Sequence, residues 1–292
     1  MTHLIDSKMM DDYREYMRRE EYSEGTVQKY LRDIRAFATW KAECENGGDA
    51  MPAGNVVADK EAAAGWKAYL VEEGYAPVTI NAMLSSLNSF FSFQGWEECK
   101  VKFLKIQRRT FRDQDRELTR AEYKRLLECA GKLDNLRLVL LMETICGTGI
   151  RVSEVKYITV EAIKSGRADI SLKGKIRTIL LPGKLCKKLR DYAKKRKIRS
   201  GEIFVTRTGK SLCRRQIWGE MKKLCEKAGV NSSKVFPHNL RHLFARTFYG
   251  LSRDIVKLAD VLGHSSIETT RIYLISTAKT HARQMERLRL IS

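Results

Sequence analysis

Three short segments, far apart in the chain, combine arginine, histidine and tyrosine in a way that suits phosphodiester chemistry. The first holds Arg151 in Thr-Gly-Ile-Arg-Val-Ser-Glu, the second holds His238 and Arg241 in Pro-His-Asn-Leu-Arg-His, and the third holds His264 and Tyr273 in a string that begins Gly-His-Ser-Ser. A phosphodiester resists attack because its negative oxygens repel a nucleophile and its 5′ oxygen is a poor leaving group. Arginine neutralises two phosphate oxygens with its planar fork, neutral histidine transfers protons near pH 7, and an activated tyrosine attacks phosphorus.

The order of these segments carries more information than any single residue. Each match alone can arise by chance, but all three in this order resemble the tyrosine recombinases, the DNA-rearranging family that includes phage integrases and Xer resolvases. The resemblance implies that Arg151 and Arg241 clamp the scissile phosphate. It also implies that Tyr273 attacks this phosphate, which leaves a 3′-phosphotyrosine and a free 5′ hydroxyl. Religation then needs no ATP, because the bond energy is conserved.

The histidines are assigned by their positions. His238 and Arg241 stand three residues apart on a predicted helix and therefore share one face, so both can contact one phosphate. His264 directly follows a glycine that is expected to end a helix, and the resemblance assigns it to the same phosphate. His242 and His281 are not assigned to the phosphate.

The leaving 5′ oxygen needs a proton, and in the resembled family a lysine on a β-hairpin turn donates it. Residues 168–172 and 177–181 have the alternating pattern of strands, and they flank a predicted turn at 173–176. The resemblance favours Lys173 as the general acid, with Lys175 as the alternative.

A helix that opens with Arg214, Arg215 and Gln216 is predicted to run to about Ala228, with Trp218 on its buried side. The resemblance places this helix in the major groove of DNA. Arginine can recognise guanine there, and glutamine can recognise adenine. The alternative is that these side chains contact only phosphates or solvent.

The N-terminal region is predicted to contain four helices. Apolar residues at helical spacing indicate helices near residues 9–17 and 27–38. A third is expected over 59–73, and a fourth from Pro77, which suits a first helical turn.

Few side chains of this region are suited to holding DNA. On the fourth helix, Asn81 and Ser85 belong to an uncharged polar face, which either lies in a DNA groove or is an ordinary solvated surface. Because the region is acidic overall, its hold on DNA would depend on a few basic residues such as Lys29, Arg32 and Arg35.

The predicted fold class is mainly α with a small β-sheet. The resemblance implies a SAM-like core-DNA-binding domain at residues 1–100 and an α+β catalytic domain at 117–292, which together form a C-shaped clamp on DNA. Residues 101–116 are basic and lack helical periodicity, so they are predicted to link the two domains. The last helix, at about 277–292, would be an exchange helix.

The composition agrees with a nucleic-acid partner. The 292 residues carry a formal net charge of +20, which favours a polyanion. Residues 1–100 contain 11 Lys and Arg against 17 Asp and Glu, whereas residues 101–292 contain 44 against 18. The basic surface is therefore expected in the C-terminal two-thirds of the chain.

The sequence offers no pattern for a metal or another cofactor, and we expect none. Its seven cysteines lack the spacing of a zinc site, and there is no phosphate-binding loop, no His-Glu-x-x-His and no acidic cluster of the two-metal kind. The scattered cysteines suit a reducing cytoplasm, and neither a signal peptide nor a run of about 20 apolar residues is present. The expected location is therefore the cytoplasm, at the bacterial nucleoid and not at a membrane.

The tail beyond Tyr273 bears on assembly. It has an apolar stripe that predicts an amphipathic helix, formed by Ala278, Ala282, Met285 and Leu288. The stripe is buried either on its own domain or, as in many relatives of the resembled family, in a neighbouring protomer. The resemblance implies a dimer on each specific double-stranded DNA site and a tetramer in the synapse, where strands exchange through a Holliday junction.

Two other functions remain open at this point. A type IB topoisomerase relaxes DNA as a monomer with a similar residue set, although the two-domain layout and the string around Tyr273 favour a recombinase. A DNA-binding regulator can keep the fold and lose catalysis, but here the constellation is intact. The sequence does not decide among integration, excision, inversion and dimer resolution, and it identifies neither the target site nor any accessory protein.

Overall fold

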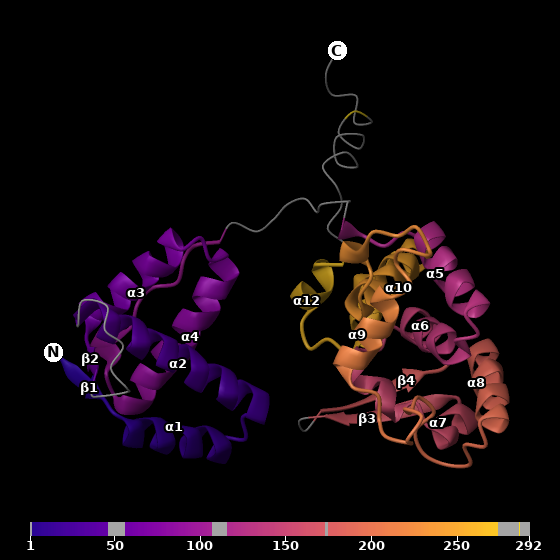
Figure 1. Cartoon of the computed structure of the whole chain (residues 1–292), viewed down its shortest axis with the longest axis horizontal. Helices are drawn as coiled ribbons and strands as arrows, with labels where there is room; N and C mark the ends of the chain where they lie inside the picture. The colour runs from indigo at the N-terminus through magenta and orange to yellow at the C-terminus, as the bar shows by residue number, and fades with distance from the viewer. Residues whose placement is uncertain (1, 46–55, 107–115, 173–174, 274–285, 287–292) are drawn as a thin grey trace. The chain divides into compact units, whose positions relative to one another are not determined.

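The computed structural model describes residues 2–45, 56–106, 116–172, 175–273 and 286. The chain divides into two compact units, Met1–Arg108 and Arg109–Ser292 (Figure 1). As predicted, the fold is mainly α-helical with small β-sheets. Among the helices described, none combines the length and apolar character that a membrane span requires.

The N-terminal unit contains the four predicted helices and, in its described part, a two-stranded antiparallel sheet. Its elements are β1 (His3–Ile5), α1 (Ser7–Arg19), α2 (Glu24–Glu45), β2 (Val56–Ala58), α3 (Lys60–Glu72), α4 (Pro77–Gln94) and the 3-10 helix η1 (Glu97–Cys99). Local signals explain the helix ends, because the side chain of Asp59 caps α3 and Pro77 occupies the first turn of α4. The sheet was not predicted, since strands of three residues are too short to show alternation.

Aromatic side chains fill the core of this unit. The rings of Tyr13, Phe37, Phe90 and Phe91 are fully buried, and Trp66 is nearly so. Their edge-on and tilted contacts join α1, α2, α3 and α4 into one core.

Two asparagines of α4 hold the chain that follows η1. The side chain of Asn88 donates to the carbonyl of Val101 at 2.9 Å and accepts from its N–H at 3.1 Å. Asn81 makes the same pair of hydrogen bonds with Leu104, at 2.9 and 2.8 Å. The beginning of the segment predicted as a linker, 101–116, therefore packs within the N-terminal unit.

The C-terminal unit is a helical domain with one β-hairpin in its described part. Its elements are α5 (Arg120–Lys132), α6 (Leu136–Thr148), η3 (Val152–Tyr157), α7 (Val160–Ser165), β3 (Arg167–Leu172), β4 (Lys175–Leu180), α8 (Gly183–Lys195), α9 (Arg214–Lys222), η4 (Ser232–Lys234), α10 (Pro237–Ser252), α11 (Ile255–Leu262) and α12 (Ile267–Arg271). The apolar helix α6 lies at the centre, where α5, α8 and α10 pack around it (Figure 1). This arrangement supplies a rigid base for the loops and helix ends that carry polar side chains.

The predicted hairpin is confirmed, but its turn is shorter than expected. Strands β3 and β4 pair antiparallel from Arg167 opposite Leu180 to Leu172 opposite Lys175. Pairing therefore continues through two residues that the sequence pattern had placed in the turn.

The predicted length of α9 was wrong. The helix ends at Lys222 rather than near Ala228, and the chain then turns. The residues beyond the helix still enter the core, because Leu224, Cys225 and Ala228 are buried.

Candidate active site

A cleft of about 760 Å³ in the C-terminal unit collects most of the residues predicted to act on a phosphate. Its lining includes Arg151, His238, Arg241 and Tyr273. Arg151 precedes η3, His238 and Arg241 lie on α10, and Tyr273 follows α12. Folding thus brings the three sequence segments to one place.

Arg241 is the most enclosed charged group of the cleft, with 2% of its surface exposed. Its Nε donates to Oη of Tyr273 at 3.3 Å, and its Nη1 donates to the carbonyl of Gly149. Its Nη2 contacts the carbonyl of Leu262 and Nε2 of His264, each at 2.8 Å. Burial lowers the pKa of Arg241, but arginine remains charged in proteins. Within the described residues none of these partners is a carboxylate, so the site favours an incoming anion.

The backbone around Arg241 requires glycine. Gly149 ends α6 in the left-handed conformation, with φ of 67°, and a Cβ there would overlap the ring of Phe244. The Thr-Gly-Ile-Arg motif therefore needs its glycine so that the carbonyl of residue 149 can meet the guanidinium.

His264 acts on Arg241 as a neutral group. Gly263 ends α11 with φ of 62°, as predicted, and the chain then brings His264 beside Arg241. Burial, reinforced by neighbouring arginines, lowers the pKa of His264 to about 4. Because arginine only donates, Nε2 of the neutral ring accepts, and we assign the remaining proton to Nδ1, which lies 2.8 Å from Oγ1 of Thr270. His264 therefore orients the guanidinium in this structure.

Histidine rings surround the proposed nucleophile. Tyr273 is 3% exposed, and its ring centroid lies 4.3 Å from that of His242, 5.7 Å from that of His264 and 5.9 Å from that of His238. His242 was not assigned to the phosphate, and it contacts the tyrosine ring. Sequence reasoning missed this role, although His242 lies one turn after His238 on the same helix face.

Arg151 differs from Arg241 in exposure and in partners. Its side chain is 43% exposed and pairs with the buried Glu154, whose carboxylate accepts from the backbone N–H of Arg151 at 2.7 Å and from its Nη1 at 3.0 Å. Arg177 of β4 donates to the same carboxylate. Neither Glu154 nor Arg177 was among the predicted site residues. The signal for Glu154 was its place in the same motif as Arg151.

Of the two candidate general acids, the structure describes only the backbone of Lys175. Lys173 lies outside the described residues, and Lys175 begins β4 opposite Leu172. The hydroxyl of Tyr157, the last residue of η3, donates to the carbonyl of Ser171 at 2.7 Å and so ties β3 to the Arg151 segment. Both lysine assignments stay predictions.

Helix α9 carries its first residues to the cleft. Arg214 and Arg215 are exposed and line it together with Trp218. Trp218 was predicted to be buried, which was wrong, since its side chain is 47% exposed. The core positions of this helix are filled by Ile217 and Met221 instead.

The third residue of α9 already has a local role. The Oε1 of Gln216 accepts a hydrogen bond from the backbone N–H of Cys213 at 2.9 Å and thereby caps the helix. Recognition of adenine uses both the oxygen and the nitrogen of a glutamine amide, so this cap competes with the predicted base contact.

The DNA-facing residues predicted in the N-terminal unit are largely engaged within that unit. Asn81 holds the chain at Leu104, and Ser85 is half-buried on α4. Lys29 and Arg32 both pair with the buried Asp33, at 2.6 and 3.0 Å. These contacts compete with DNA for the same polar groups.

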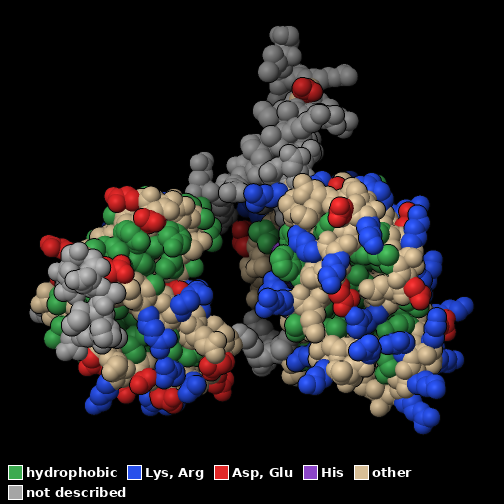
Figure 2. Space-filling view, in the orientation of Figure 1, with side chains coloured by type: hydrophobic (Ala, Val, Ile, Leu, Met, Phe, Trp, Pro, Cys, Tyr) green, Lys and Arg blue, Asp and Glu red, His purple; other side chains and the backbone are tan. Residues whose placement is uncertain are grey.

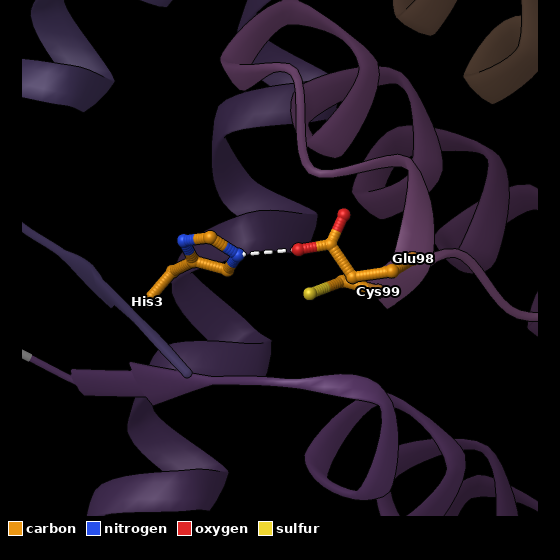
Figure 3. Close-up of side chains that lie close together, drawn as sticks. All are labelled: His3, Glu98 and Cys99. Carbon is orange, nitrogen blue, oxygen red and sulfur yellow. Dashed lines mark hydrogen bonds and ion pairs between the residues drawn. The ribbon is translucent and has the colours of Figure 1, made fainter. Parts of the chain in front are cut away.

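One group in the described residues has the chemistry of metal ligands. His3, Glu98 and Cys99 place nitrogen, oxygen and sulfur atoms within 4.8 Å of one another (Figure 3). However, Nε2 of His3 lies 2.7 Å from Oε1 of Glu98, and the imidazole stacks on Trp96 at 4.4 Å. The hydrogen bond from His3 lowers the pKa of Glu98, and burial raises the pKa of the Cys99 thiol. The observed contacts therefore fasten β1 to η1.

Comparison with known families settles the relationship. Residues 116–280 match the model of the phage integrase family, and residues 10–98 match that of the phage integrase N-terminal SAM-like domain. The chain belongs to the phage integrase family. This confirms the family predicted from the sequence, together with the SAM-like character of the N-terminal fold.

Known relatives resemble the chain along most of its length. The tyrosine recombinase XerA of Pyrococcus furiosus is 29% identical, over 98% of this chain and 95% of the relative. The tyrosine recombinase XerD of Xanthomonas campestris is 28% identical, over 88% of this chain and 83% of the relative.

Solved structures share the fold. The Tn1549 transposon integrase in complex with transposon right end DNA aligns with a TM-score of 0.69 at 18% identity, covering 96% of this chain and 99% of the other. The lambda integrase dimer bound to a COC′ core site aligns with a TM-score of 0.67 at 17% identity, covering 93% and 77%.

As a member of this family, the protein is a tyrosine-type site-specific recombinase, the function predicted from its sequence. The comparisons favour neither a type IB topoisomerase nor an inactive regulator.

Proposed function

We propose that this recombinase cleaves and rejoins DNA at specific sites through a covalent 3′-phosphotyrosyl intermediate on Tyr273. The observation that carries the proposal is the buried guanidinium of Arg241, which contacts Oη of Tyr273 and has no carboxylate among its described partners. A phosphate bound in the cleft would compensate the charge of Arg241 and would lie beside the nucleophile. Arg151, more exposed in the same cleft, completes the clamp.

In the proposed reaction Oη of Tyr273 forms a bond to phosphorus while the bond from phosphorus to the 5′ oxygen breaks. His238, exposed in the cleft, accepts the phenol proton. Lys173, or Lys175 as the alternative, protonates the leaving oxygen. Charge that develops on the non-bridging oxygens is stabilised by the two arginines, and attack by a 5′ hydroxyl reverses these steps.

Double-stranded DNA is the proposed substrate of the cleft. Figure 2 shows Lys and Arg side chains distributed over the visible face of the C-terminal unit, which suits contact with a phosphate backbone. Arg214, Arg215 and Gln216 are proposed to enter the major groove at the start of α9. The DNA complexes of the Tn1549 and lambda integrases support this proposal by analogy.

The domain roles extend the same proposal. Residues 1–100 would act as the core-binding domain through the face of α4 that carries Asn81 and Ser85. Residues 101–116 would join it to the catalytic domain, 117–292, so that the two domains close around DNA.

Assembly on DNA is proposed to need the C-terminal tail. The C-terminal unit has a largely apolar pocket of about 310 Å³, whose lining includes Tyr123, Leu243, Phe244, Phe248 and Leu251. We propose that the tail helix of a neighbouring protomer, at about 277–292, fills this pocket. Two protomers would then occupy one site, and four would form the synapse.

A nicked suicide substrate tests the covalent step. The wild-type protein should become linked to such DNA, because the released fragment cannot be rejoined. Tyr273→Phe should bind the site with ordinary affinity and form no covalent complex, since only the attacking oxygen is removed. Trapping of this variant on the DNA would show that another residue attacks.

Truncation tests the assembly. A chain that ends at Thr277 should bind one half-site normally but lose cooperative binding of two half-sites and lose recombination. Full-rate recombination by the truncated protein would contradict the exchange of tails. We propose that the protein acts in the bacterial cytoplasm, at the nucleoid. Mapping of its covalent complexes on genomic DNA would identify its target sites and test this location.

A further inference from the structure

Arg177 lies near the cleft, and it has no role in the proposed reaction. It lies in β4, four residues after Lys173 and two after Lys175. Its side chain is 15% exposed and burial lowers its pKa, so this position carries a desolvated charge.

The guanidinium of Arg177 bridges two other elements of the site. Its Nη1 donates to the carbonyl of Leu262 at the end of α11, and its Nη2 donates to Oε2 of Glu154 in η3. A Cβ at Gly263 would overlap the Arg177 side chain. The glycine that ends α11 therefore also makes room for the arginine from the hairpin.

Both partners of Arg177 are shared with the phosphate clamp. The carbonyl of Leu262 also accepts from Nη2 of Arg241, at 2.8 Å. The carboxylate of Glu154 also holds the backbone N–H and Nη1 of Arg151. One side chain thus connects the β-hairpin to each of the two arginines of the clamp.

The chemistry of arginine explains why this position needs a fork. A guanidinium donates in two directions at fixed geometry, whereas the ammonium of lysine is a compact point charge on a flexible stem. The guanidinium of Arg177 donates to the carboxylate of Glu154 and to the carbonyl of Leu262, and these two contacts restrict its movement. Arg177 therefore fixes the position of the hairpin relative to the two clamp arginines.

We propose that Arg177 is a positioning residue, which sets the hairpin lysine relative to the phosphate held by Arg151 and Arg241. This proposal rests on the proposed function, in which a lysine at the hairpin tip protonates the leaving 5′ oxygen. Misplacement by about 1 Å can lower the rate of a reaction by about 10²-fold. Loss of the fork should therefore slow protonation of the leaving group more than it weakens DNA binding.

The test compares two suicide substrates that differ in one atom. In one the leaving atom is the ordinary 5′ oxygen, and in the other it is sulfur, which leaves as a thiolate without needing a proton. Arg177→Lys should cleave the ordinary substrate about 10²-fold more slowly than wild type. It should cleave the sulfur substrate within a few-fold of the wild-type rate.

Arg167→Lys is the matched control, because it makes the same substitution at an exposed position of the same hairpin. It should cleave both substrates at the wild-type rate. Arg177→Met removes the charge as well as the fork. Thermal unfolding and affinity for the target site are measured beside cleavage, so that a loss of folding or binding is distinguished from a loss of cleavage. If Arg177→Lys is equally slow on both substrates, or as fast as wild type on the ordinary one, the positioning role is overturned.

The same experiment separates this inference from the proposed function. Sulfur rescue of Lys173→Ala or Lys175→Ala establishes which lysine is the acid, and either result is compatible with the role of Arg177. If wild-type protein forms no covalent complex through Tyr273, the proposed function fails first. A further outcome is that the wild-type protein forms the covalent complex and the sulfur substrate restores cleavage by Lys173→Ala or Lys175→Ala. If the sulfur substrate does not restore cleavage by Arg177→Lys in that case, only the inference about Arg177 fails.

Discussion

Lys29, Arg32 and Asn81 of the N-terminal unit and Arg241 of the C-terminal unit have opposite kinds of partner. In the N-terminal unit, Lys29 and Arg32 share the buried carboxylate of Asp33, and Asn81 is engaged with the backbone at Leu104. In the cleft of the C-terminal unit, Arg241 is buried among carbonyls, a histidine and a tyrosine hydroxyl. Figure 2 shows acidic and basic side chains interspersed on the visible face of the N-terminal unit.

This difference shows that residue type alone does not mark a phosphate site. A basic side chain that is already paired with a buried carboxylate binds a phosphate less favourably, because the phosphate must replace an existing partner. A buried guanidinium surrounded by neutral acceptors binds a phosphate more favourably, since its charge is not compensated. The following experiments break or sharpen this contrast, from the largest expected effect to the smallest.

Removal of either clamp arginine should have the largest effect. Arg241→Ala and Arg151→Ala should each lower the cleavage rate by about 10²–10³-fold, equivalent to about 2.7–4 kcal/mol of barrier, because each removes a group aimed at developing charge. Cleavage of a suicide substrate at saturating protein measures this. Target-site affinity should change far less. Near-normal cleavage by either variant would show that the substituted arginine does not stabilise the transition state.

Asp33→Asn should destabilise the N-terminal unit without affecting chemistry. The change removes the buried charge that holds Lys29 and Arg32, and we expect a loss of about 1–3 kcal/mol in the free energy of unfolding. Glu15→Gln is the control, because its exposed pair with Arg18 should be worth at most about 1 kcal/mol. Denaturant unfolding measures both. Equal stability of the two variants would contradict the structural role of Asp33.

Asn81→Ala and Ser85→Ala separate packing from DNA contact on α4. Loss of the Asn81 amide removes two hydrogen bonds to Leu104 and should cost about 1–2 kcal/mol of unfolding free energy, while Ser85→Ala should cost less. Binding to the target site is measured in parallel. Weaker binding by Ser85→Ala at unchanged stability would support the DNA-facing prediction, and unchanged binding by both variants would refute it.

His264 should make the stability of the protein depend on pH. Its pKa is about 4 in the folded protein, below the ordinary value near 6.5, so the unfolded chain binds a proton first as pH falls. Its contribution to stability is therefore complete above about pH 6.5 and is lost as pH falls toward 4. His264→Gln should flatten the difference in stability between pH 7 and pH 5. An NMR titration of His264 near pH 6.5 in the free protein would disprove this.

Local patterns determined much of what was predicted correctly. The four N-terminal helices and the hairpin follow from periodicity, capping residues and glycines, all of which act within a few residues. The motif residues that line the cleft were found because each motif is a contiguous string with a residue type suited to phosphate. Arg151, His238, Arg241 and Tyr273 are therefore visible in the sequence and meet in the structure.

Tertiary structure decided how those residues are held. Arg177 reaches Glu154 and Leu262 across 23 and 85 residues of chain, and His242 contacts the ring of Tyr273, which only folding brings beside it. Trp218 is exposed because Ile217 and Met221 already fill the core. Such partners depend on which distant surfaces pack together, and no local period or cap encodes that. The sequence by itself determined the chemical groups of this site, whereas packing between distant segments determined their charge partners and orientation.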